Sequence, residues 1–208
     1  MNATVPKFLA EEALNLSALF IHFSTDYVFD GKSGNYTEED ITNPINYYGY
    51  TKEMGEKITL RNHNNLVIRT SMIYGSSDKV RFLRYVIENL SSGKEIEAYD
   101  DIFNSATLLN ELINGILMAI KQNVSGIFHM VGSSCISRYE FAKIIADVFG
   151  FNKELVKPVS VQHMKLNAIR PKSPCLSNLK ATKIIGVNFS TIENGIKQVY
   201  LEKENLPI

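Results

Sequence analysis

Two side chains that could move a proton lie four residues apart, Tyr48 and Lys52. On a helix, residues at i and i+4 share one face, so the Lys52 ammonium can lie beside the Tyr48 phenol. A phenol has an ordinary pKa of ~10, and a neighbouring cation lowers it. A hydroxyl at the end of the upstream apolar run, Thr25 or Ser24, could orient a substrate oxygen against that phenol. Together these groups predict a site that moves a proton onto or off a carbonyl oxygen.

The elements that must position these residues can be predicted from hydrophobic patterning. The apolar run 18–23 predicts a strand buried on both faces, and 66–68 and 126–131 predict further buried strands. Helices are expected around Tyr48 and Lys52, over 79–90, over 108–120 and after a capping box at Ser137 and Glu140. Strands and helices alternate early and helices dominate late. We therefore expect an α/β protein with a parallel sheet and a smaller, mostly helical part.

Three motifs in order carry a family resemblance. They are Ser-Thr-Asp-Tyr-Val-Phe-Asp-Gly at 24–31, Tyr-Gly-Tyr-Thr-Lys at 48–52 and Ile-Arg-Thr-Ser-Met-Ile-Tyr-Gly at 68–75. The chain resembles the extended short-chain dehydrogenase/reductases, and within them the dTDP-4-dehydrorhamnose reductase branch. Segments 126–129, 137–142 and 170–172 resemble that branch too, so the resemblance runs over nearly the whole chain. A lone Tyr-x-x-x-Lys is weak evidence, whereas three motifs in order are specific.

The resemblance implies the activity and the division of the chain. It implies reduction of a nucleotide-linked 4-keto-6-deoxy sugar by NADPH or NADH, which supplies the hydride. The fold it implies is a Rossmann-like parallel sheet. The Rossmann-like part would comprise 1–76 and 100–132, and the substrate-binding part would comprise 77–99 and 133–208.

The same resemblance implies roles for individual residues. Tyr48 would protonate the alkoxide, Thr25 would hold the oxygen, and Lys52 would lower the pKa of Tyr48. Tyr48 and Lys52 would also contact the cofactor at the nicotinamide ribose. Tyr47 and Tyr50 compete for the phenol role, but neither has a lysine four residues on.

Five further residues follow from the resemblance. Thr70 and Ser71 come after a strand, where ligands bind in open α/β sheets, and would lie near the nicotinamide. The alternative for them is a polar loop without a ligand. Asp26 and Tyr27 would lie near the sugar. Arg170 would grip a phosphate of the sugar nucleotide, or else it is a surface arginine.

A glycine-rich turn that would hold a dinucleotide pyrophosphate is absent, since none of the twelve glycines forms G-x-G-x-x-G. The first residues resemble the helix before the family's catalytic strand, so we expect an N-terminally truncated sheet. A homodimer or a partner chain would then cover its edge. A rival reading is a non-catalytic sugar-nucleotide-binding or regulatory subunit, as in relatives that regulate methionine adenosyltransferase. A third alternative is an epimerase or dehydratase of the same extended family. It is disfavoured because dehydratases of this family favour acidic residues after the catalytic threonine, and here Tyr27 rather than a glutamate follows Asp26.

Composition excludes several classes of function. The 22 basic and 22 acidic residues of this 208-residue chain cancel, which argues against nucleic acid and anionic membrane partners. No apolar stretch approaches the ~18 residues of a membrane helix and no secretory signal is evident, so we expect a cytoplasmic protein. Cys135 and Cys175, far apart in sequence, are expected to be reduced. The four histidines lack metal-ligand spacing, and His22 and His129 are expected in the core.

Overall fold

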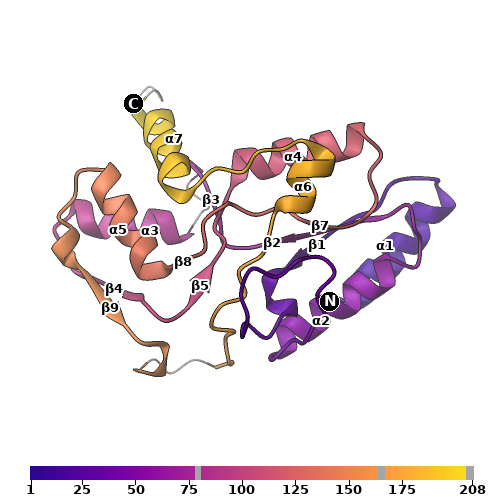
Figure 1. The fold of residues 1–208 in the computed structure, drawn as a ribbon, viewed down its shortest axis with the longest axis horizontal. Helices are drawn as coiled ribbons and strands as arrows, with labels where there is room; N and C mark the ends of the chain where they lie inside the picture. Colours follow the sequence, from indigo (N-terminus) through magenta and orange to yellow (C-terminus); the bar gives the residue numbers. More distant parts are fainter. Residues whose placement is uncertain (78–80, 164–166, 205–208) are drawn as a thin grey trace.

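The computed structural model describes residues 1–77, 81–163 and 167–204. Its central sheet has three parallel strands in the order β1 (Ile21–Thr25), β2 (Leu66–Thr70) and β7 (Gly126–His129) (Figure 1). Thr25 pairs with Thr70 in register, so the carboxyl ends of β1 and β2 meet at one edge of the sheet. The predicted α/β class with a parallel sheet is confirmed.

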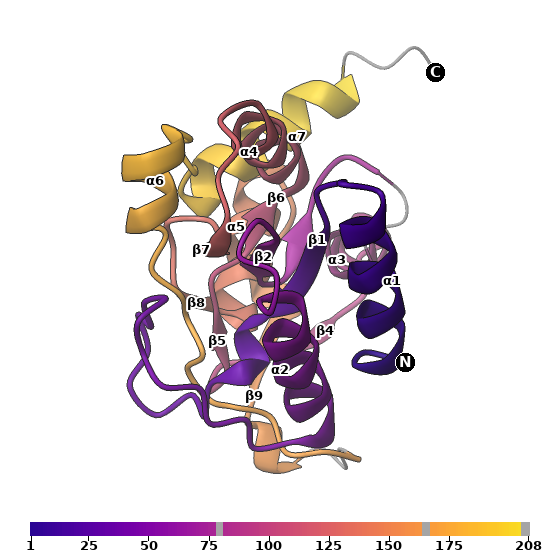
Figure 2. The same ribbon diagram turned by 90° about the vertical axis from the view of Figure 1, so that its right-hand side faces the viewer.

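Helices cover both faces of this sheet (Figures 1 and 2). On one face lie α1 (Thr4–Asn15) and α2 (Tyr47–Thr59), and on the other lie α4 (Leu109–Lys121) and α6 (Leu179–Ile185). Leu66 and Ile68 of β2 pack with α4 and α6 in one buried cluster. The predicted boundaries assign α6 to the substrate-binding part, whereas the structure packs it against the central sheet.

A second core lies beside the sheet (Figure 1). Helices α3 (Arg81–Ser91), α5 (Arg138–Val148) and α7 (Ile192–Glu204) pack there around the parallel pair β4 (Ile96–Tyr99) and β9 (Val156–Val159). The predicted capping box is confirmed, because Ser137 and Glu140 exchange hydrogen bonds at the start of α5. The expected helix 79–90 is present from Arg81; residues 79 and 80 lie outside the described ranges.

Short strands connect the two parts. A parallel pair joins β3 (Ile73–Tyr74) to β6 (Thr107–Leu108), and an antiparallel pair joins β5 (Phe103–Asn104) to β8 (Ile136–Ser137). Three single 3₁₀ turns complete the described elements, at Asp26–Val28, Lys153–Leu155 and Val161–His163.

The expectation that the first strand is buried on both faces is wrong. The strand starts at Ile21, and the side chain of Phe23 is 44% exposed. The reason is its place in the sheet, since among the described strands β1 lies at the edge with β2 on one side. An apolar run of strand length does not distinguish an interior strand from an edge strand that is uncovered.

The expectation of two reduced cysteines is also wrong in this structure. Cys135 and Cys175 form a disulfide, with their Cα atoms 5.7 Å apart. The two cysteines are 40 positions apart, and the chain between them leaves through α5 and returns through β9 to the same place. The two cysteines are far apart in sequence, so their proximity in space could not be predicted without the tertiary fold.

The two histidines expected in the core lie there, since His22 and His129 are both buried. Within the described ranges, no set of three or more histidine, cysteine and carboxylate side chains is arranged to hold a metal ion. Each helix in those ranges is also too short or too polar to cross a bilayer.

Candidate active site

Thr25 ends β1 and orders the turn that follows. Its hydroxyl accepts a hydrogen bond from the backbone N–H of Tyr27 at 3.3 Å and so caps the 3₁₀ turn Asp26–Val28. The same hydroxyl donates to Oδ1 of Asp26 at 2.9 Å. The Thr25 hydroxyl therefore donates to Asp26 and accepts from Tyr27 at the same time.

Asp26 joins the carboxyl ends of two strands. Its side chain is buried, and Oδ2 accepts hydrogen bonds from Ser71 Oγ at 2.5 Å and from Asn104 Nδ2 at 3.0 Å. Burial raises the pKa of this carboxyl, and the donors from Ser71, Thr25 and Asn104 oppose the rise. Asp26 was predicted to bind substrate, and the partners that the structure gives it are protein groups. Asn104 was missed, because nothing marks an asparagine in a two-residue strand.

Tyr48 lies in the first turn of α2, close to Tyr27. The side chain of Asn46 caps this helix by accepting from the N–H of Gly49 at 2.8 Å. Gly49 is required here, because a β-carbon would collide with the carbonyl oxygen of Tyr27. The Tyr48 ring meets the Tyr27 ring edge-on at 6.0 Å, and its side chain is 47% exposed. Its phenol is therefore half open to solvent beside the end of β1.

The expectation that Lys52 lowers the pKa of Tyr48 is not met in this structure. Burial raises the pKa of the Tyr48 phenol, while a hydrogen bond with Thr25 lowers it less. The Lys52 ammonium instead donates to the carbonyl oxygen of Phe23 at 2.7 Å, and burial lowers its own pKa. The i, i+4 spacing placed both residues on α2 correctly. It could not reveal that a backbone acceptor on β1 competes for the ammonium.

Thr70 and Ser71, predicted to lie near the nicotinamide, are both buried at the end of β2. Thr70 donates to the hydroxyl of Thr107 at 3.3 Å, and Ser71 donates to Asp26. The structure thus brings Ser71 into the hydrogen-bond network of Thr25. Thr70 belongs to a neighbouring network that reaches β6.

Two arginines approach Tyr27 from the other side. A hydrogen bond from Arg170 and the charge of Arg138 lower the pKa of Tyr27, against a larger rise from burial. The guanidinium of Arg170 lies 6.0 Å from the ring centroid of Tyr99, and that of Arg138 lies 5.2 Å from the ring centroid of Phe82. Burial and the Arg170 charge lower the pKa of Arg138. Arg138 was missed, although it stands in the capping-box segment that carried the resemblance.

These side chains border an open pocket of about 490 Å³. Tyr27, Tyr48 and Arg170 line it, with Asn46 and the segment 167–169. Asn46 ties that segment to α2, since its amide donates to the carbonyl oxygen of Ile169 at 2.9 Å. The structure thus brings Thr25, Asp26, Tyr27, Tyr48 and Arg170 together, while Lys52 contacts the carbonyl of Phe23 on β1.

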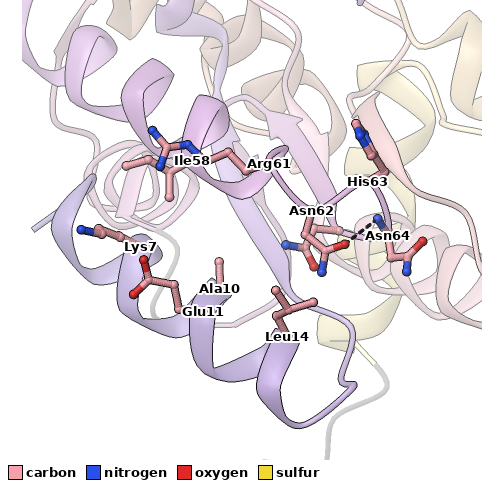
Figure 3. Close-up of a pocket in the computed structure, with 10 residues that line it drawn as sticks. Lys7, Ala10, Glu11, Leu14, Ile58, Arg61, Asn62, His63 and Asn64 are labelled. Carbon is pink, nitrogen blue, oxygen red and sulfur yellow. Dashed lines mark hydrogen bonds between the residues drawn. The ribbon is translucent and has the colours of Figure 1, made fainter.

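A second pocket of about 390 Å³ lies elsewhere, between α1 and α2 (Figure 3). Ala10 and Leu14 of α1 face Ile58 of α2 across it, and polar side chains of 61–65 close one end. It contains none of the predicted site residues.

Comparison with known proteins defines the family. The family model of the RmlD substrate binding domain matches residues 1–205. The chain belongs to this family. A probable low-salt glycan biosynthesis reductase of Haloferax volcanii, Agl14, is 30% identical over 202 residues, which are 94% of this chain and 67% of that protein. Methionine adenosyltransferase 2 subunit beta of Mus musculus is 32% identical, covering 91% of this chain and 59% of that protein.

Among solved structures, the RmlD-family chain is similar to a dTDP-4-dehydrorhamnose reductase of Bacillus anthracis in complex with NADP. The TM-score is 0.90 at 28% identity, and the match covers 97% of this chain and 72% of the other. This likeness confirms the Rossmann-like reductase fold predicted from the motifs. The chain spans about six- to seven-tenths of the length of these three proteins.

Proposed function

We propose that the chain carries the proton-transfer and sugar-binding half of an NADPH- or NADH-dependent reductase of a nucleotide-linked 4-keto-6-deoxy sugar. The observation that carries the proposal is the convergence of the Tyr48 phenol and the Thr25 hydroxyl beside the pocket that Arg170 lines. The family match and the likeness to a dTDP-4-dehydrorhamnose reductase support it. We further propose that the reaction belongs to the cytoplasm, where nucleotide-linked sugars are made.

In this proposal the Tyr48 phenol is the acid that protonates the sugar alkoxide. The phenol is protonated at neutral pH and so can donate, although its raised pKa makes it a weaker acid than a free phenol. Thr25 is proposed to hold the same oxygen by accepting a hydrogen bond from it once Tyr48 has protonated it, because the Thr25 proton itself is donated to Asp26. Asp26 is thus proposed to position Thr25, and Ser71 and Asn104 fix the Asp26 carboxylate by donating hydrogen bonds to it.

Arg138 and Arg170 are proposed to hold the diphosphate of the sugar nucleotide. In the described ranges neither is found in an ion pair, and the Nε of Arg138 is buried without a hydrogen-bond partner. Two neighbouring guanidinium groups repel each other, and a bidentate dianion would relieve that repulsion. Next to them, Phe82, Tyr85 and Tyr99 line an open pocket of about 450 Å³ that suits a nucleoside ring.

A nicotinamide cofactor would supply the hydride when bound. The residues fit its nicotinamide end, because the phenol of Tyr48 is half exposed and the hydroxyl of Ser24, at the end of β1, is buried without a hydrogen-bond partner. Tyr48 and Lys52 would hold the nicotinamide ribose, and Thr70 and Ser71 would lie near the nicotinamide. The pyrophosphate has no glycine-rich turn in this sequence.

The test measures NADPH oxidation with dTDP-4-dehydro-L-rhamnose for the parent chain, for Tyr48→Phe and for Tyr50→Phe. Loss of the acid should lower the rate roughly 10²–10⁴-fold in Tyr48→Phe. Tyr50 lies on the same helix and is also half exposed, so Tyr50→Phe should keep the parent rate. Equal rates for parent and Tyr48→Phe would remove Tyr48 from the mechanism.

A regulatory subunit is the second candidate function. It is favoured by the identity of 32% with methionine adenosyltransferase 2 subunit beta. In this case the chain would bind a sugar nucleotide or a partner enzyme without turnover. Calorimetric titration with NADPH separates the two candidates, because tight cofactor binding by this chain alone would argue against a non-catalytic role.

A further inference from the structure

The Cys135–Cys175 disulfide joins two segments that each carry an arginine of the candidate site. Arg138 stands three positions after Cys135, and Arg170 stands five positions before Cys175. Both guanidinium groups act on Tyr27, Arg170 through a hydrogen bond and Arg138 through its charge. The bridge therefore connects the two segments that must stay close for both arginines to reach one ligand.

Strand β5 contacts both bridged segments, where the two parts of the fold meet (Figure 1). On one side β5 pairs with β8, the strand that follows Cys135. On the other side the N–H of Phe103 donates to the carbonyl oxygen of Lys172 at 2.8 Å, and the N–H of Leu176 donates to the hydroxyl of Ser105 at 3.1 Å. Both strands are two residues long, so few backbone hydrogen bonds hold them together. A covalent link across such a short pairing restricts it strongly.

Strand β5 also supplies a residue to the candidate site. Asn104 donates to the buried carboxylate of Asp26, which accepts from the hydroxyl of Thr25. Asn104, Arg138 and Arg170 thus come from three short pieces of chain that meet at the bridge. A change in the bridge can reach all three.

The two sulfur atoms differ in their access to solvent. Cys135 is exposed, whereas Cys175 is only 1% exposed. Exchange with a thiol begins when a thiolate attacks one sulfur of the disulfide, and access decides which sulfur is attacked. A reductant would therefore attack Cys135, and Cys175 would be the leaving group.

We propose that the bridge is a site of thiol–disulfide exchange with a dithiol reductant, and that its reduction weakens the binding of a nucleoside diphosphate by Arg138 and Arg170. One thiolate of the dithiol attacks Cys135 Sγ, the Sγ–Sγ bond breaks, and Cys175 leaves as a thiolate that takes up a proton. The second thiol of the reductant then attacks the reductant's sulfur in the mixed disulfide. This step releases Cys135 as a thiol and the reductant as a cyclic disulfide, so two electrons pass to the bridge.

The effect on binding follows from preorganisation and rests on the proposed function. While the bridge is intact, the segments of Arg138 and Arg170 are held together before any ligand arrives. Two like charges repel each other, so the segments can move apart once the covalent link is broken. The ligand must then restore the arrangement at a cost in affinity. Oxidation of the two thiols would reverse the effect.

The first test locates the attacked sulfur. The oxidised, folded chain is treated with glutathione, quenched with acid and digested for peptide mass spectrometry. The mixed disulfide should form on Cys135, with Cys175 recovered as a free thiol. An adduct on Cys175, or an adduct that forms only when urea unfolds the chain, would overturn the assignment.

The second test is calorimetric titration with dTDP. Reduction with dithiothreitol should raise the Kd at least about 5-fold, while near-ultraviolet circular dichroism confirms that the chain stays folded. Cys135→Ser changes only the exposed cysteine and should bind as the reduced parent does, with or without dithiothreitol. The same Kd for the oxidised and the reduced parent would contradict the proposal.

A variant separates this effect from general loosening of the fold. In Arg138→Met one of the two guanidinium groups is gone, so dithiothreitol should change the Kd for dTDP less than about 2-fold. If the bridge only stabilised the fold, reduction would weaken binding by the same factor in Arg138→Met as in the parent.

Amide hydrogen exchange tests the mechanical link without any ligand. The Phe103 amide should exchange at least about 10-fold faster after reduction, because its acceptor on Lys172 is held less firmly. The amide of Ile68, on the buried central strand β2, is the control and should not change. A Phe103 amide that exchanges equally fast in both states would break the link between the bridge and the site. If the oxidised chain does not bind dTDP at all, the proposed function fails, and the glutathione adduct and the Phe103 amide still decide the exchange site.

Discussion

At the scale of residues, one buried carboxylate organises the hydroxyls of the site. Asp26 accepts from Thr25 on one oxygen and from Ser71 and Asn104 on the other, so it links the ends of β1 and β2 to β5. An ionised carboxylate in such a place is stable only while these donors are present. The Thr25 hydroxyl is thereby held in one orientation next to Tyr48.

Asn104→Ala tests this network directly. Removing one donor should raise the pKa of Asp26 further and cost about 1–3 kcal/mol of unfolding free energy, because a buried acceptor loses its partner. ¹³C NMR of the carboxyl and urea unfolding measure the two effects. Asn110→Ala is the control, since Asn110 donates to Glu202 at 3.0 Å on the surface and should cost far less. Equal costs for both variants would contradict the role given to Asn104.

His22 predicts a pH dependence of stability. Burial, and less so the charge of Lys52, lowers its pKa from 6.5 to about 4. As the pH falls below 6.5, His22 takes up a proton in the unfolded chain. In the folded chain it stays neutral until about pH 4. The stability that depends on neutral His22 is complete above this window and is lost as the pH falls through it, by at most about 1.4 kcal/mol per pH unit.

Urea unfolding at several pH values checks this expectation. His22→Val, which suits a buried strand position, should flatten the slope of unfolding free energy against pH. His63→Gln, at an exposed position, should leave the slope as it is in the parent. A slope in His22→Val as steep as that of the parent would assign the proton uptake to other groups.

At the scale of elements, an ion pair fixes the helix that carries Tyr48 against the sheet. Glu56 of α2 and Arg69 of β2 are both buried, and Arg69 Nη2 lies 2.8 Å from Glu56 Oε2. Arg69 Nε makes a second contact with Oε1 at 2.9 Å, so the pair is bidentate. The guanidinium also lies 5.0 Å from the ring centroid of Phe29. The register of α2 on β2 is therefore set by charge as well as by packing.

Breaking this pair should be costly. Arg69→Met leaves the Glu56 carboxylate buried without its partner, and we expect a loss of about 3–5 kcal/mol in unfolding free energy. The control is Lys157→Met, which removes an exposed pair with Glu95 and should cost less than about 1 kcal/mol. Denaturant unfolding compares them. Similar losses would show that the buried pair contributes no more than a surface pair.

At the scale of the whole molecule, the described residues form three buried clusters, and the central sheet ends at β1 on one side and at β7 on the other. The sheet is covered on both faces but ends at β1, and the second core gathers α3, α5 and α7 around β4 and β9. The pocket of the site lies where the end of β1 and the start of α2 meet the returning segment at Arg170. Both parts of the chain must therefore fold before the site exists.

The disulfide is the prediction that belongs to this scale. Closing a loop between residues 40 apart should stabilise the fold by about 4 kcal/mol through lost entropy of the unfolded chain. Cys135→Ser should therefore unfold at lower urea than the parent when no reductant is present. With reductant the two proteins should unfold alike. If thiol titration of the native parent, purified without reductant, finds two free thiols, the disulfide is contradicted and the reduced cysteines expected from the sequence are correct.

The sequence alone determined most of the elements, and it predicted several residues that the structure brings together. Hydrophobic periodicity predicted the helices and the parallel sheet, because burial of one face follows from local spacing. Motif order placed Thr25, Asp26, Tyr27, Tyr48 and Arg170 at a common site. Spacing along one helix is a local property, so residues that share a helical face in the prediction also share it in the folded protein.

Tertiary structure alone decided which groups touch. It turned Lys52 to the Phe23 carbonyl, joined Cys135 to Cys175, and supplied Asn104 and Arg138 from elements remote in sequence. It also left β1 at an edge, where a buried strand was expected. The physical reason is common to all: hydrogen bonds, charges and bridges act over a few ångströms of space, and a sequence records order along the chain but not distance across it.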